Sequence, residues 1–132
     1  MVPEQLPACL AVPFLTSCHG TTVPHYGGQE LELHDVLLDP GSASTFFSTD
    51  ALSAIGLTYE PDDPLHCIHG IGGSDFVFMK RVNQASIGER EVHDFAVEVG
   101  GMDYGFQLDG LVGTDLLLAV GAVIDLATLE IR

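Results

Sequence analysis

The chain has 132 residues, of which 46% are apolar and 17% are charged, with 15 glycines and no tryptophan. This length suits one domain with a modest core and is too short for a two-lobed protein, so we expect a single domain over residues 1–132. Four Lys and Arg residues against 19 Asp and Glu give a formal net charge of −15. Binding to phosphate needs clustered basic residues, so the composition argues against nucleic acid and anionic membranes as partners.

The cysteines and the beginning of the chain bear on the cellular compartment. Cys9, Cys18 and Cys67 are odd in number and form no C-x-x-C pair, which predicts neither a disulfide framework nor a four-thiolate zinc site. The first residues lack the basic stretch and the uninterrupted apolar core of a secretory signal, and the apolar run 8–15 is broken by Pro13. We therefore expect a cytoplasmic protein.

Short strands dominate the first third of the predicted fold. An early strand is expected over 9–16, with Pro13 placing it at a sheet edge, and a turn-rich stretch follows over 19–28. Apolar residues alternate from residue 31 and become continuous over 36–38. This pattern predicts a strand that enters the core and ends abruptly at the turn 39–42.

The remainder predicts one short helix, two hairpins and a final helix between strands. The first helix is expected over 49–56, with Ser48 or Thr49 as its cap and Gly56 at its end. The later elements are a hairpin over 65–80 around the glycine-rich tip 70–74, a hairpin joining 82–87 to 92–99, a strand over 108–113, a helix over 114–120 and strands over 122–126 and 129–131. This succession predicts an all-β fold, a small closed β-barrel or sandwich with two short helices.

Carboxylates are the most informative side chains for function. Asp39 directly follows the buried strand 36–38, and an apolar approach to an acid is costly unless the acid is hydrogen-bonded or used chemically. Taken alone, this pattern favours an ordinary turn in which Asp39 accepts hydrogen bonds from backbone amides. Asp109 and Asp115 are expected to be acceptors at a turn and at a helix end.

Four segments in a fixed order resemble the retropepsin-like aspartic proteases. They are VLLDPGSAST (36–45), ALSAIGL (51–57), HGIGGSDFVF (69–78) and DGLVGTDLL (109–117). Members of that family carry Asp-Thr-Gly or Asp-Ser-Gly in the first segment, a flap in the third, and an apolar strand ending in glycine before a helix in the fourth. The resemblance extends over nearly the whole chain and implies a closed β-barrel of the acid protease type.

The resemblance implies an aspartic endopeptidase. Family chains of this size supply one catalytic Asp each, so a chain with a single Asp-x-Gly-Ser motif is expected to be a homodimer in which Asp39 of both protomers forms the dyad. Two adjacent carboxylates would share a proton, and one would act as base toward a water while the other acts as acid. The implied partner is a peptide or protein substrate, and no metal or other cofactor is implied.

The resemblance also implies roles for residues around the dyad. Gly41 would hydrogen-bond the substrate, and Ser42 would belong to the same substrate-binding site. The tip of the flap would close over an extended peptide and contact it through Gly70, Ile71, Gly72 and Gly73. Val112 and Gly113 would form the floor that positions Asp39. Taken alone, the glycines of the tip are equally typical of a surface hairpin.

Pro40 departs from the family, which has Thr or Ser at this position. That hydroxyl normally joins hydrogen bonds across the dimer axis, and proline removes both the hydroxyl and the backbone donor. The alternative hypothesis is therefore a catalytically impaired domain that binds peptides or dimerises. A purely structural assembly domain is a further alternative, but it gives no reason for a buried strand to end in an acid.

Two other kinds of site have weaker support. His66, Cys67 and His69 lie close together in the sequence, but adjacent strand residues face opposite sides, and this spacing matches no standard zinc site. A Ser-His-Asp arrangement around Ser42 or Ser44 lacks the G-x-S-x-G elbow.

Overall fold

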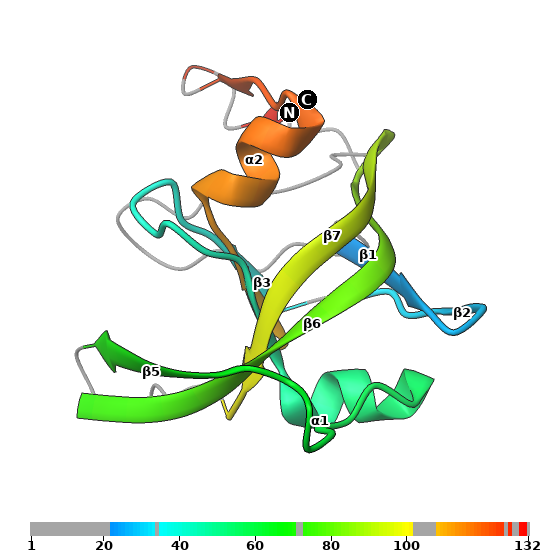
Figure 1. Cartoon of the computed structure of the whole chain (residues 1–132). Helices are drawn as coiled ribbons and strands as arrows, with labels where there is room; N and C mark the ends of the chain where they lie inside the picture. Colours follow the sequence, from blue (N-terminus) through cyan, green and yellow to red (C-terminus); the bar gives the residue numbers. More distant parts are fainter. Residues whose placement is uncertain are drawn as a thin grey trace.

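The computed structural model describes residues 22–33, 35–70, 73–101, 108–125, 127 and 130–131. This part of the chain is mostly β, with two short α-helices, and the main sheet curls into a half-barrel (Figure 1). The all-β prediction is thus confirmed, while the strand expected over 9–16 lies outside the described residues. Within the described ranges, no helix has the length and apolar character needed to cross a membrane.

The first described element is a hairpin of β1 (Thr22–Tyr26) and β2 (Gln29–Glu30). Its two-residue turn, 27–28, consists of glycines with φ of 59° and 81°, the pair of positive values that a type I′ turn requires. Strand β1 was not predicted, because Pro24 made the segment read as a turn. Pro24 accepts a hydrogen bond from Leu31 N (3.1 Å) but cannot donate one in return, so regular pairing ends at Glu30.

The two longest strands of the sheet, β6 (Gly73–Ile87) and β7 (Arg90–Gly100), form a long antiparallel hairpin. The sequence predicted two separate strands where β6 is continuous. Halfway along, pairing lapses between Asn83 and Asp94, and Asp94 has a φ of 55°. Buried positions on β6 shift phase there, so both halves of the ribbon face the core and the ribbon curves strongly (Figure 1).

Strand β5 (Leu65–Gly70) pairs with β6 and makes the predicted glycine-tipped hairpin. The last pair is Gly70 with Gly73, and the tip residues 71–72 lie outside the described residues. Phe78 at the base is buried, whereas Phe76 is 69% exposed. The hairpin therefore extends beyond the core (Figure 1).

Three short strands meet in the part of the sheet that carries Asp39. Strand β8 (Gly110–Val112) lies between β3 (Val36–Leu38) and β4 (Phe46–Ser48), parallel to the first and antiparallel to the second. The full order is β2-β1-β6-β7-β4-β8-β3, with β5 on β6. Because β8 separates two strands that are consecutive in the chain, the loop 39–45 must pass over its end.

The helices begin and end as their local signals predict. Helix α1 (Thr49–Leu52) continues as a 3-10 turn, η1 (Ser53–Ile55), and the hydroxyl of Ser48 accepts from Ala51 N at its start. Gly56 closes it with a left-handed φ of 78°. Helix α2 (Thr114–Val120) likewise ends at a glycine.

The C-terminal residues form a separate pair of short strands, β9 (Ile124–Asp125) and β10 (Glu130–Ile131). The core between the curled sheet and the two helices contains Leu33, Val36, Leu38, Phe47, Leu52, Ile55, Leu57, Phe78, Val82, Val97, Val99, Val112, Leu116 and Ile131.

Candidate active site

Asp39 lies one residue beyond β3, where the strand leaves the core. Its N–H donates to Val112 O (2.9 Å), so pairing with β8 continues to this residue. Its carbonyl accepts from Ser42 N (3.0 Å), which closes a tight turn over 39–42. Pro40 occupies the second position of this turn, where its fixed φ is favourable.

Asp39 as a residue is half-buried, and its carboxylate is oriented by the same turn. Gly41 N–H donates to Asp39 Oδ1 at 2.9 Å, and a Cβ built on Gly41 would lie 3.2 Å from that oxygen. No other described residue hydrogen-bonds this carboxylate. This bond is the one that the simple turn interpretation predicts, and it also leaves Oδ2 available for chemistry.

Val112 and Gly113 lie beneath the turn. Val112 is fully buried, and a Cβ on Gly113 would come within 2.4 Å of Ser44 O and 2.8 Å of Ser42 O. Backbone oxygens cannot withdraw as a flexible side chain can, so only glycine fits here. The structure thus brings Val112 and Gly113 against the Asp39 loop.

A family model described as aspartyl protease matches residues 25–116. The chain belongs to this family, which is of the retropepsin-like kind. The matched segment runs from β1 to the first turn of α2 and includes Asp39, the β5–β6 hairpin and Gly113. Membership supports a protease, and hence a hydrolase, as the general class of activity. No curated protein matches the chain.

Two threonines of this aspartyl protease family member hold the loop 39–45. Neither of them was assigned a role from the sequence. The buried Thr45 donates from Oγ1 to Asp115 Oδ1 (2.7 Å) and accepts from Gly113 N (3.1 Å). Thr114, the first residue of α2, places its hydroxyl 2.8 Å from Pro40 O. No sequence signal identifies either residue, because their partners lie about 70 positions away in the chain.

Ser42, Pro40 and two nearby acids complete the surroundings of the loop 39–45. Ser42 is half-buried, and its hydroxyl donates to Ser44 O (2.9 Å). Pro40 is exposed. Asp115 Oδ1 also accepts from Leu116 N (2.7 Å) at the start of α2, and Asp109 Oδ2 accepts from Asp35 N (3.3 Å). Asp115 thus makes the helix-end bond predicted for it, whereas Asp109 accepts from a residue 74 positions away and not from its own turn.

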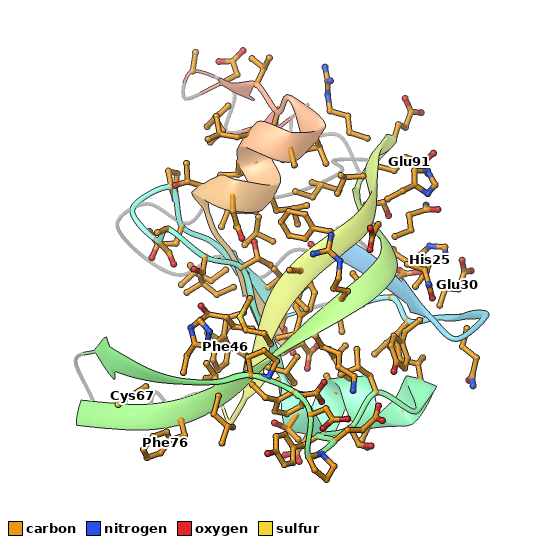
Figure 2. All side chains as sticks on the ribbon, viewed as in Figure 1. His25, Glu30, Phe46, Cys67, Phe76 and Glu91 are labelled. Carbon is orange, nitrogen blue, oxygen red and sulfur yellow. The ribbon has the colours of Figure 1, made fainter. Side chains whose placement is uncertain are left out.

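The β5–β6 hairpin, which was expected to be the flap, is described except at its tip. Gly70 and Gly73 pair with each other, and Ile71 and Gly72 lie outside the described residues. Cys67 and Phe76 lie opposite each other on the extending part of the hairpin (Figure 2). Among the side chains that the structure describes, which do not include His69, no three His, Cys, Asp or Glu residues gather as metal ligands do.

Proposed function

We propose that the protein is an aspartic endopeptidase that works as a homodimer with a closed-barrel protomer. Asp39 of one protomer and Asp39 of its partner form the catalytic dyad in this proposal. A single observation carries it: within the segment matched by the aspartyl protease family, Asp39 follows a buried strand and has its carboxylate oriented by Gly41 N–H. The chain supplies one such motif, so a second chain must supply the other acid.

The proposed reaction uses one shared proton. The ionised Asp39 takes a proton from a water whose oxygen attacks the peptide carbonyl carbon, and the protonated Asp39 donates to the carbonyl oxygen. The C–N bond of the resulting tetrahedral intermediate then breaks as the first Asp39 returns its proton to the nitrogen. A hydroxyl proton of the intermediate goes back to the second Asp39, which regenerates the dyad. The products are a carboxylic acid and an amine.

Substrate would bind between the dyad and the flap. Gly41 and Ser42 border the carboxylate of Asp39 in the loop, and Val112 and Gly113 support that loop from below. The flap residues Gly70, Ile71, Gly72 and Gly73 would pair with the peptide backbone and exclude water.

The first test compares the parent protein with Asp39→Asn on a diverse peptide library, read by mass spectrometry from acidic to neutral pH. We expect cleavage by the parent and none by the variant, because an amide cannot serve as base or acid. Asp109→Asn is the matched control, since its side chain can still accept from Asp35 N. Cleavage that survives in Asp39→Asn would remove Asp39 from the mechanism.

A mixing experiment tests the dyad across two protomers. Parent and Asp39→Asn chains are mixed in equal amounts and allowed to exchange. Parent homodimers then make up about a quarter of all dimers, so activity per parent chain should fall to about half. Activity that stays proportional to the amount of parent chain would show that each chain works alone. Sedimentation equilibrium on the parent gives the dimer population independently.

The alternative function is a catalytically impaired domain that binds peptides or dimerises, and Pro40 is the observation that favours it. Pro40 has neither the hydroxyl nor the N–H that the family's Thr or Ser would bring to the dimer axis. Peptide capture without turnover by a folded, dimeric parent would support this alternative. Pro40→Thr should then gain cleavage activity if the missing groups are the cause.

A further inference from the structure

Because position 40 is a proline, the turn 39–42 has few polar groups that can form hydrogen bonds with the rest of the protein. Proline has no N–H, and its side chain has no polar atom. The carbonyl of Pro40 is therefore the only hydrogen-bonding group of this residue. That carbonyl shares one planar peptide unit with the N–H of Gly41, and this N–H donates to Asp39 Oδ1 at 2.9 Å. Anything that fixes the Pro40 carbonyl therefore also fixes the donor that orients Asp39.

Thr114 contacts this peptide unit from the side opposite Asp39. Its Oγ1 lies 2.8 Å from Pro40 O and 3.0 Å from Ser42 O, and its backbone N–H donates to Ser42 O at 2.7 Å. A hydroxyl has one proton and so can donate to only one of these two oxygens. We assign the bond to Pro40 O, because it is nearer and because Ser42 O already accepts the backbone N–H of Thr114. Gly113 brings Thr114 this close, because any side chain there would collide with Ser42 O and Ser44 O.

We propose that Thr114 is a positioning residue for Asp39, acting through the Pro40–Gly41 peptide unit. Its hydroxyl holds the Pro40 carbonyl, the rigid peptide plane holds the Gly41 N–H, and the Gly41 N–H holds Asp39 Oδ1. The restraint lies within one chain, in a turn that lacks the side-chain hydroxyl of its relatives at position 40. The catalytic part of this inference rests on the proposed function, since positioning matters for turnover only if Asp39 is catalytic.

The test removes the hydroxyl and then restores it. Thr114→Val is nearly isosteric and lacks the hydroxyl, Thr114→Ala lacks it without keeping the bulk, and Thr114→Ser retains it. Ser53→Ala is the matched control, because Ser53 Oγ also donates to a backbone carbonyl, Asp50 O (2.8 Å), but does so where α1 passes into η1. Circular dichroism and urea unfolding establish that each variant is folded and how far its stability has changed.

The first readout is the amide signal of Gly41 in ¹H–¹⁵N spectra, which reports its hydrogen bond to Asp39 whether or not peptide is cleaved. We expect the proton signal to move upfield and its hydrogen exchange to accelerate in Thr114→Val and Thr114→Ala. The signal should return to the parent position in Thr114→Ser and stay there in Ser53→Ala. An unchanged Gly41 signal in both variants without the hydroxyl would overturn the inference.

The second readout is the division of kinetic effects between kcat and KM. Misplacing a reacting group acts on the chemical step, so we expect Thr114→Val to lower kcat by about tenfold and to change KM by less than about twofold. Thr114→Ser should recover most of kcat. Parent-like kcat in Thr114→Val, with Asp39→Asn inactive, would overturn the inference and leave the proposed function intact. Parent protein without Asp39-dependent cleavage would overturn the proposed function, and the Gly41 signal would then decide the positioning role alone.

Discussion

Gly113 marks a close approach between the connection from β8 to α2 and the loop 39–45. Its Cα lies under the carbonyls of Ser42 and Ser44, at a separation that leaves no room for a Cβ, and its N–H donates to Thr45 Oγ1. At the scale of single residues, the loop 39–45 is thus held by the close packing that Gly113 permits, by two threonine hydroxyls and by backbone hydrogen bonds.

We expect Gly113→Ala to lower the free energy of unfolding by about 2 kcal/mol or more, because the colliding atoms belong to the backbone. Urea unfolding measures this value. Gly101→Ala is the control, since a Cβ on Gly101 meets no atom of the described residues within 4 Å. Equal losses in the two variants would contradict the close packing described for Gly113.

Among the elements, the segment 57–64 between η1 and β5 is held to β6 by a partly buried ion cluster. Lys80 is only 8% exposed, and its Nζ lies 2.6 Å from Glu60 Oε1 and 2.8 Å from Asp63 Oδ2. The hydrogen bond from Lys80 holds the pKa of Asp63 below its ordinary value of 3.8. Burial lowers the pKa of Lys80, but the hydrogen bonds that Lys80 donates to Asp63 and Glu60, together with nearby negative charge, outweigh burial and leave that pKa above 10.5.

These shifts set a pH dependence of stability. Because the folded-state pKa of Asp63 is lowered, its contribution is complete above pH 3.8 and is lost as the pH falls through the folded-state value. We expect Asp63→Asn to destabilise the protein at neutral pH and to lose this effect as the pH drops below 3.8. Urea unfolding at several pH values measures the difference. A loss of stability in Asp63→Asn that is equally large at neutral pH and below pH 3.8 would contradict the ion pair. Asp62→Asn, at an exposed neighbouring position, serves as the control.

The bend in the β6–β7 ribbon makes a second element-scale prediction. Asp94 has a φ of 55°, a region in which glycine is comfortable and β-branched residues are strained. Its ion pair with Arg81 joins two exposed side chains and contributes little. We therefore expect Asp94→Gly to unfold at nearly the parent urea concentration and Asp94→Val at a clearly lower one. Arg81→Met measures the loss of the ion pair together with the hydrogen bond from Arg81 to Asp94 O (2.6 Å). Similar midpoints for the Gly and Val variants would argue against strain at the bend.

At the scale of the whole molecule, the net charge of −15 dominates long-range interactions. Such a field accelerates the approach of cationic peptides and slows anionic ones, and salt screens it over about 10 Å at 0.1 M. We expect kcat/KM for a lysine-rich peptide to fall severalfold as NaCl is raised, while kcat/KM for a neutral peptide with the same scissile residues stays nearly constant. Equal salt dependence for both peptides would contradict steering by net charge.

The predictions from sequence succeeded where the signal is local. The cap at Ser48, the left-handed Gly56, the turn after Asp39 and the glycine-tipped hairpin were all expected, because each depends on residues a few positions apart. Strand β1 was missed because a proline such as Pro24 disfavours an interior strand. Pro24 is tolerated in β1 because the side on which it lacks an N–H faces the end of β2, where regular pairing stops.

The sequence by itself determined the two short helices, the glycine-tipped hairpin, the family resemblance and the carboxylate that follows β3. Only the tertiary structure decided that β6 runs unbroken through a bend and that β8 lies between β3 and β4. It also decided that Thr45, within the loop 39–45, bonds Gly113, and that Thr114 bonds Pro40 in the same loop. The physical reason is chain distance: a hydroxyl and a carbonyl more than 70 residues apart meet only when the whole sheet has folded, and no local pattern encodes their meeting.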